Sequence, residues 1–551
     1  MALVTINASV EDTRASCSCV ASSCLDAPVP NDPFSDEPIL PAISQPAKAP
    51  ETSRSYGQIL KSSALIGGSQ VANIAIGIVR TKAMAMLLGP AGFGLFGLYG
   101  SIANLTQSIA SMGINSSGVR QIAEAVGTGN EMQIAQTTAV LRRTSTILGL
   151  VGATLLLVFS RQVSRLTFGN TDRTAAVCLL SIAVFFSLVS AGQGALIQGV
   201  RRIADLAKMN SLGAFFGACL SIPLVYFFRE RGVVPSLVSV AAMTVVTSWW
   251  YSRKIAVQRV VVNLSMFRRE TWALLKLGSV FMASGFLTMG VSYFVRITVL
   301  HSISFEATGL YQSAWNLGGF YVGIILQAMG ADFYPRLTAS INNNTECNRL
   351  VNEQTLVGLL LAGPGVIATL TFAPLVIALL YTAKFGAAVG ILRWICLGAT
   401  LQVITWPMGF IIVAKGKPGV FFYAELAWTT VAIGLAWACV KSFGLNGAGI
   451  AFFGSYVFHV FLIYPIVRYL SGFRWSTQNR RTGVFFLALI TVVFCSFYVL
   501  PPLLSAGVGM LAAILSGVYS IRVLVRLIPL DRFPRPIRRL ITGLRFATAV
   551  L

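Results

Sequence analysis

The sequence predicts an all-α polytopic membrane protein with about fourteen transmembrane helices. Two parallel six-helix repeats, an N-lobe and a C-lobe around a central cavity, are followed by two additional helices. Of the 551 residues, 55% are hydrophobic and only 11% are charged, and the mean hydropathy is +0.74. A soluble domain carries about twice that charged fraction. Apolar runs of roughly 20 residues, enough to cross a bilayer core, recur along the chain. Short motifs also recur after 215 to 217 residues.

Residues 1–56 precede the first apolar run, and we predict a disordered cytosolic tail. Residues 1–55 hold 7 of the 19 acidic residues but only 3 of the 42 basic ones, and they are rich in proline and serine. Such a segment has too little apolar surface to form a core. It also lacks the apolar centre of a signal peptide. The tail therefore makes no predicted contribution to the helical bundle.

The apolar runs give three further regions. Residues 57–260 form the N-lobe with helices 1–6, residues 261–470 form the C-lobe with helices 7–12, and residues 471–551 hold the additional pair and a basic cytosolic tail. The predicted spans are 58–80, 92–113, 144–160, 174–199, 209–228, 232–251, 277–300, 309–331, 355–373, 387–413, 418–440, 446–467, 482–500 and 503–522.

The two lobes are predicted from a weak internal repeat. Its matched pairs are Leu60-Lys61 with Leu275-Lys276, Arg80 with Arg296, Gly94-Leu95-Phe96 with Gly309-Leu310-Tyr311, and Met112-Gly113 with Met329-Gly330. Six spans per copy is an even number, so both copies insert in the same direction and are related by an axis along the membrane normal. Repeat interfaces are where transporters bind their cargo, so we expect a pathway between the lobes.

Basic residues set the predicted orientation. With fourteen spans and both termini in the cytosol, most Lys and Arg residues fall on the cytosolic side, as the positive-inside rule requires. The net charge of +23 is spread through short loops. That distribution indicates membrane orientation and contact with lipid head groups, and it does not predict nucleic-acid binding.

Polar stripes identify the helices that face the cavity. The second span carries Ser101, Asn104, Ser108, Ser111 and Asn115 at steps of three and four residues. Its repeat partner carries Asn316 in a similar stripe, and the first span carries Asn73. Amides exposed to lipid are costly, so each stripe faces either protein or water. Helix–helix packing explains any single small polar residue, and the whole set favours an aqueous cavity. We therefore predict Asn73, Asn104 and Asn316 as cavity residues.

Four basic residues are predicted to bind an anionic substrate. Arg80 and Arg296 lie toward the far ends of their helices, where either cavity binding or extension to the membrane surface fits the pattern. Lys82 is a weaker candidate, and Lys415 at the inner end of the tenth span is either an entry site or a positive flank. Guanidinium groups in a cavity suit phosphate because they form two parallel hydrogen bonds.

Two acidic residues are predicted as ion-coupling candidates. Glu425 lies within the eleventh span, and Asp332 lies at the inner end of the eighth. The alternative for Glu425 is a buried pair with Lys417 or Arg393, and for Asp332 a local pair with Arg336. No catalytic, metal or cofactor site is predicted. The chain lacks a P-loop and paired carboxylates, and no large extramembrane domain is present.

Three stretches carry a resemblance to a known family. They are Lys61-Ser-Ser-Ala-Leu-Ile-Gly-Gly-Ser-Gln70, Gly77-Ile-Val-Arg80-Thr-Lys82 and Leu88-Gly-Pro-Ala-Gly92-Phe-Gly94-Leu-Phe-Gly97-Leu-Tyr99, joined later by Gly330-Ala-Asp332-Phe-Tyr334-Pro335-Arg336-Leu. They resemble the O-antigen and lipid-linked oligosaccharide flippases, the polysaccharide transport branch of the multidrug/oligosaccharidyl-lipid/polysaccharide exporter superfamily. The acidic N-terminal extension and the last two helices depart from that pattern.

The resemblance implies a non-enzymatic flippase for lipopolysaccharide biosynthesis. Such a protein moves an undecaprenyl-pyrophosphate-linked oligosaccharide repeat unit across the bacterial inner membrane by alternating access, coupled to a proton or ion gradient. Its implied partners are that lipid-linked oligosaccharide, membrane lipids, and polysaccharide polymerase or chain-length proteins. Two alternatives stay open: a multidrug or metabolite cation antiporter, and a peptidoglycan-precursor (lipid II) flippase of the same superfamily.

Overall fold

The described part of the computed structural model covers residues 51–127, 129–255, 260 and 262–527. Within it, the side chains of residues 51–71, 277, 279–281, 284, 320, 327–332 and 335 are not described. Residues Gln58–Leu551 form one compact unit, which is described by itself below. The predicted tail of residues 1–56 lies almost wholly outside the described residues, as does the end of the basic tail.

Every regular element in the described residues is helical, which confirms the all-α prediction. The elements up to the middle of the chain are α1 (Glu51–Ser111), α2 (Ile114–Gly127), α3 (Glu131–Val158), α4 (Ser160–Phe168), α5 (Thr174–Gly199), α6 (Ile203–Phe228), η1 (Arg229–Gly232) and α7 (Val233–Ser252). The elements that follow are α8 (Leu264–Ser302), α9 (Phe305–Ala339), α10 (Asn344–Thr371), α11 (Ala373–Leu380), η2 (Ala383–Phe385), α12 (Ala388–Ala414), α13 (Pro418–Phe443), η3 (Gly444–Asn446), α14 (Gly447–Ser471), α15 (Thr477–Val499) and α16 (Pro502–Leu527).

The same order of elements occurs twice. In each half a long helix (α3 or α10) leads into a short one (α4 or α11), and a long helix (α5 or α12) follows. Each half then ends with two helices joined by a 3-10 turn, α6–η1–α7 in one and α13–η3–α14 in the other. This order agrees with the repeat seen in the sequence. We call the halves the first repeat (α1–α7) and the second repeat (α8–α14); the exact lobe boundaries stay predictions.

Within the described residues, nine candidate membrane spans are long and apolar enough to cross a bilayer. Three of them, of 40, 50 and 54 residues, are much longer than one crossing. Each of these three includes a predicted boundary between two spans. The membrane-protein prediction is therefore confirmed, while the number of fourteen crossings stays a prediction.

A glycine breaks α1 into the two predicted spans. Gly89 has φ 65° and ψ −175°, a conformation that glycine adopts without steric cost. Pro90 follows at the start of the next helical segment, where its missing N–H costs nothing. The sequence Leu88-Gly89-Pro90 thus sets the direction of the second segment of α1, which carries most of the predicted cavity stripe.

The two repeats meet at a pair of matched glycines. A Cβ atom on Gly94 of α1 would lie 2.8 Å from the backbone nitrogen of Gly309, and one on Gly309 of α9 would lie 1.8 Å from the Pro90 carbonyl oxygen. Only residues without a side chain permit backbones to approach this closely. These positions are 215 residues apart in the sequence, so the helices cross at equivalent points.

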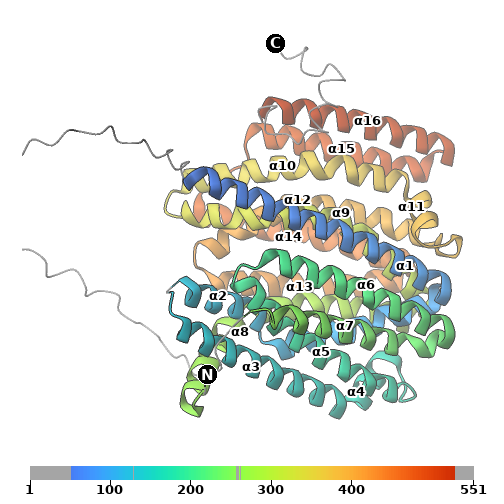
Figure 1. Ribbon diagram of the computed structural model, residues 1–551. Helices are drawn as coiled ribbons and strands as arrows, with labels where there is room; N and C mark the ends of the chain where they lie inside the picture. Colours follow the sequence, from blue (N-terminus) through green and yellow to red (C-terminus); the bar gives the residue numbers. More distant parts are fainter. Residues whose placement is uncertain (1–50, 128, 256–259, 261, 528–551) are drawn as a thin grey trace, which may run out of the picture. The chain divides into compact units, whose positions relative to one another are not determined.

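The additional helices α15 and α16 pack against the second repeat. Figure 1 shows them (red) beside α10, and α15 also contacts α12. The Thr482 and Tyr519 hydroxyls are 3.1 Å apart, and the Phe485 ring lies 4.6 Å from the Tyr519 ring. Polar and aromatic contacts of this kind hold helices together in lipid, where no hydrophobic driving force exists between them.

Candidate functional site

The second repeat encloses a cavity of about 540 Å³, which we call the second cavity. Its walls come from α8, α9, α12, α13 and α14, and Asn104 of α1 completes it. Its polar lining residues are Asn104, Thr288, Ser292, Arg296, Gln312, Asn316, Gln402 and Ser455. The volume falls within the roughly 300–1,000 Å³ typical of ligand sites. The polar stripe predicted on α9 therefore faces a cavity.

Arg296 lies inside this cavity and does not reach the membrane surface. The residue is only 6% exposed. Its Nε donates to Gln312 Oε1 at 2.6 Å, and its Nη1 donates to the Ser292 carbonyl oxygen at 2.7 Å and to the Ser292 hydroxyl. Gln312 in turn donates to Asn316 Oδ1 at 2.8 Å. All these partners are neutral, so the positive charge is oriented but not compensated.

Aromatic rings form a second part of the lining, which we call the aromatic wall. Trp315 packs edge-on against Phe452 at 5.4 Å, and Phe452 packs against Tyr456 at 5.0 Å. Trp428 completes the group 5.8 Å from Tyr456. All four line the second cavity. The buried Nε1 of Trp428 has no hydrogen-bond partner among the described residues, so one donor is free for a ligand. Rings with a polar edge provide both flat apolar contact and hydrogen bonding.

The first repeat encloses a cavity of about 490 Å³, the first cavity, with a different lining. Side-chain amides dominate it: Asn104, Gln107, Asn115, Gln198 and Asn210. Asn104 lines both cavities, so they adjoin at the second segment of α1. Amides both donate and accept hydrogen bonds, which suits hydroxyl-rich ligands.

Arg80 lines the first cavity and has a donor to spare. Its Nε donates to the Ser221 hydroxyl at 3.2 Å, and its guanidinium lies 5.4 Å from the centre of the Phe96 ring. Its Nη2 is buried and has no hydrogen-bond partner among the described residues. A buried cationic donor left unpaired is costly, and a bound anion would satisfy it.

The two cavities have the same pattern of charged residues. Among the described lining residues, Arg296 is the one charged residue of the second cavity and Arg80 the one of the first, and none is Asp or Glu. A positive charge surrounded by low-dielectric walls attracts anions and excludes cations. The repeat-related arginines thus place one positive charge in each of two adjoining cavities.

Three predicted residues lie outside both linings. Asn73 is half-buried with a buried Oδ1 that lacks a partner among the described residues, and Lys82 is half-buried. Lys415 instead fixes the turn between α9 and α10: its Nζ donates to the Ile341 carbonyl oxygen at 2.7 Å and to Asn344 Oδ1 at 2.6 Å. The role predicted for these three in substrate binding gains no support from their positions.

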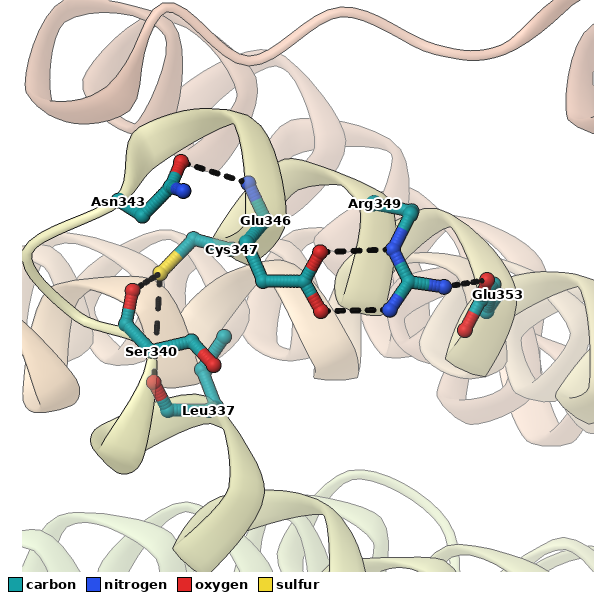
Figure 2. A network of polar contacts seen from close by, with 7 residues as sticks. All are labelled: Leu337, Ser340, Asn343, Glu346, Cys347, Arg349 and Glu353. Atoms are coloured by element: carbon teal, nitrogen blue, oxygen red, sulfur yellow. Dashed lines mark hydrogen bonds and ion pairs between the residues drawn. The ribbon is translucent and has the colours of Figure 1, made fainter.

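A polar network surrounds the turn that Lys415 contacts. Figure 2 shows the Asn343 side chain accepting from the Glu346 backbone N–H at 3.1 Å, which caps α10. Arg349 donates to both Glu346 carboxylate oxygens, at 2.8 and 2.5 Å, and also contacts Glu353. The Cys347 thiol donates to the Ser340 carbonyl oxygen at 3.2 Å. These contacts order a helix start and place no group in a cavity.

Glu425 is half-buried on α13 and has no ion pair or hydrogen bond among the described residues. The alternative pair with Arg393 is absent, because that guanidinium stacks on Phe497 at 3.6 Å. Glu425 precedes Trp428 by about one turn and is close enough to Tyr456 to interact with it electrostatically. It therefore lies behind the aromatic wall of the second cavity. The side chain of Asp332 is outside the described residues.

Several lining residues were not predicted. Three of them are amides near helix ends or inside apolar runs: Gln107, Gln198 and Asn210. Exposing an amide side chain to lipid costs free energy, and this cost is the signal that would have identified them. The aromatic residues gave no such signal, because Trp and Tyr are equally common in helix packing and at membrane surfaces.

Comparison with known proteins gives consistent results. The family described as "Polysaccharide biosynthesis protein" matches residues 83–390. The lipid III flippase of Escherichia coli is 23% identical over 417 residues, covering 72% of this chain and 95% of that protein. The fold is similar to that of the lipid II flippase MurJ in an inward closed conformation, with a TM-score of 0.64, 13% identity, and coverage of 84% of this chain and 100% of that one. An inward-facing MATE family transporter of the MOP superfamily gives 0.61 at 16% identity, covering 73% and 96%.

Proposed function

Since the chain belongs to the family of polysaccharide biosynthesis proteins, we propose that it is a flippase for a lipid-linked oligosaccharide. The substrate class is an oligosaccharide repeat unit on a polyprenyl pyrophosphate, undecaprenyl pyrophosphate in a bacterial inner membrane. The observation that carries this proposal is the charge of the two cavities, each of which has one arginine and no acid among its described lining residues. The curated relatives named lipid III flippase support the same class.

The chemical groups of the substrate's head group match the side chains that line the cavities. Arg80 and Arg296 have no negatively charged partner among the described residues, and the pyrophosphate provides one. Charge-assisted hydrogen bonds of this kind are about twice as strong as neutral ones. Sugar hydroxyls match the amides of the first cavity, and the apolar faces of sugar rings match the Trp and Tyr rings of the second. The polyprenyl chain has no polar groups and stays in lipid.

In this proposal the two anion sites hold the pyrophosphate together while the repeats change the side of the membrane to which the cavities open. The cavities adjoin at Asn104, so the pyrophosphate is able to meet both arginines. Because binding is shared between two sites, the affinity of each site stays low enough for the substrate to be released. The close contact of Gly94 with Gly309 is the point at which the repeats separate and rejoin.

The charge of the cavities disfavours a cation antiporter. That function needs acids in the cavity to bind a cationic drug, and neither lining includes one. A lipid II flippase shares the anionic head group with our proposal, so the identity of the transported sugar decides between them.

Depletion of the protein in its native cell tests the function. We expect surface polysaccharide to disappear and its lipid-linked repeat unit to accumulate on the cytosolic side, where it resists added periplasmic glycosidases. Accumulation of the peptidoglycan precursor with cell lysis would assign the lipid II alternative. Unchanged polysaccharide and unchanged lipid pools would exclude both flippase functions.

We propose that Glu425 couples transport to the proton gradient. It is an acid within a membrane helix without a partner among the described residues, and its neighbour Tyr456 on α14, which packs against Trp428, is the group through which protonation would reach the aromatic wall. Glu425→Gln removes the charge change, so transport should become insensitive to uncouplers. The measurement is transport into vesicles with and without an imposed pH gradient.

The control for this measurement is Glu306→Gln, which changes an exposed acid of α9. Its protein should respond to the gradient as the wild type does. A Glu425→Gln protein with an unaltered gradient response would show that coupling occurs elsewhere.

A further inference from the structure

A third cavity, of about 500 Å³, lies between α3 and the start of α8. It shares no residue with the two substrate cavities. Arg142 and Arg143 of α3 supply two cations, and Ile147 of α3 together with Leu264 and Phe267 of α8 supplies an apolar wall. The combination of two adjacent cations with an apolar wall is amphipathic, and neither half is explained by the proposed transport path.

The depth of this cavity is that of a membrane–water interface. The Arg142 Nη2 donates to the carbonyl oxygen of Ser252, the last residue of α7, at 3.3 Å. The same end of α7 carries Trp249 and Trp250, which are about half exposed, and Arg253 stacks on Trp249 at 4.4 Å. Exposed Trp beside Arg marks the level of lipid head groups. On α3, the part of the helix without charged residues begins directly after Arg143.

The cations of the cavity are available to a ligand. Arg143 is exposed and has no partner among the described residues, while Arg142 forms only its bond to Ser252. The charged groups nearby on α8 are Arg268, Arg269 and Glu270, and Glu270 is occupied by Arg269 at 3.3 Å. None of the described residues that line the cavity is an acid. The local charge is therefore positive and uncompensated.

The apolar wall is equally uncovered. Leu264 is 69% exposed and Ile147 is 47% exposed, although both belong to a cavity. At the interface, such side chains contact the first carbons of lipid chains. A small soluble anion would use the arginines but leave this wall in water, whereas a phospholipid would satisfy both sides.

We propose that this cavity binds one anionic phospholipid of the surrounding leaflet. Its phosphate lies on Arg142 and Arg143, and its acyl chain runs along Ile147, Leu264 and Phe267. Basic pockets between transmembrane helices are a known form of lipid head-group site. The bound lipid joins α3 of the first repeat to α8 of the second, and it is separate from the transported substrate.

Native mass spectrometry of the purified full chain with added phosphatidylglycerol tests this site. We expect one tightly held lipid per chain. In Arg142→Gln/Arg143→Gln its apparent affinity should fall about 30-fold, the loss expected for two basic side chains at an anionic surface. The single Arg143→Gln should lose about 5-fold. Because Arg143 forms no hydrogen bond or ion pair with a described residue, this variant tests binding even where the double variant folds poorly.

The matched control is Arg480→Gln/Arg481→Gln. These are two adjacent exposed arginines at the start of α15, on the same predicted side of the membrane and outside all three cavities. This protein should keep the lipid. Equal loss in the control, or no loss in the Arg143→Gln protein, would overturn the site. Displacement of the lipid by millimolar inorganic phosphate would also overturn it, because that outcome assigns the arginines to a free anion.

Discussion

Replacing Arg80 or Arg296 with glutamine should lower transport of the lipid-linked oligosaccharide by about 10- to 100-fold, because a hydrogen bond to a charged group contributes about 1.5–3 kcal/mol. Each arginine is the one charged residue that the structure describes in the lining of its cavity. Glutamine keeps a donor but removes the charge that holds pyrophosphate. The measurement is the rate of transport in vesicles at equal amounts of inserted protein.

The two arginines should differ in a second measurement. Arg296 holds Gln312 and Ser292, so Arg296→Gln should also lower the thermal unfolding temperature. Arg80 makes one side-chain hydrogen bond and leaves Nη2 free, so Arg80→Gln should change transport more than stability. The control is Lys82→Gln, two residues from Arg80 on the same helix and outside both linings. If the Lys82→Gln protein loses as much transport activity as the Arg80→Gln protein, transport depends on the general positive charge of this helix and not on the charge inside the cavity.

Gly309→Val should abolish transport even in protein that reaches the membrane. A Cβ at this position would lie 1.8 Å from the Pro90 carbonyl oxygen, and backbone atoms cannot move aside as a flexible side chain does. The helices α1 and α9 must then separate, which costs about 1–3 kcal/mol or more for an overpacked contact. The measurements are the transport rate and the thermal unfolding temperature. Both should fall, because the substitution opens the close contact between the repeats.

The matched control for this substitution is Gly77→Val. Gly77 also lies on α1, and a Cβ there would meet nothing within 4 Å. Transport by the Gly77→Val protein should be close to that of the wild type. A Gly309→Val protein that transports normally would mean that the repeats do not need to meet at this contact.

The sequence was sufficient to predict the helical membrane fold, because apolar runs and a repeat of charges and glycines are visible without any contact information. Arg80, Arg296 and the Gly94/Gly309 pair all came from the same offset of 215–216 residues. Their depth was not predictable, since one helical turn separates a residue in a cavity from one at the membrane surface. The structure places both arginines in cavities.

The less successful predictions share a cause. Lys415 at the inner end of α12 looks the same in sequence whether it faces a cavity or fixes a turn, and the turn residues Ile341 and Asn344 are about 70 positions away. The aromatic wall combines Trp315, Trp428, Phe452 and Tyr456 from three helices, and only the packing of those helices brings them together. Long-range contacts of this kind leave no periodic signal in a single sequence.

Reconstitution of the purified protein in vesicles tests the proposed function most directly. The substrate is a polyprenyl-pyrophosphate-linked oligosaccharide placed in one leaflet, and the measurement is the fraction that becomes accessible to an enzyme confined to the other side. The two anion sites predict transfer by the wild-type protein, almost none by Arg80→Gln/Arg296→Gln, and inhibition by a soluble pyrophosphate-linked sugar. Equal transfer by the wild-type and doubly substituted proteins would contradict the role of the paired arginines.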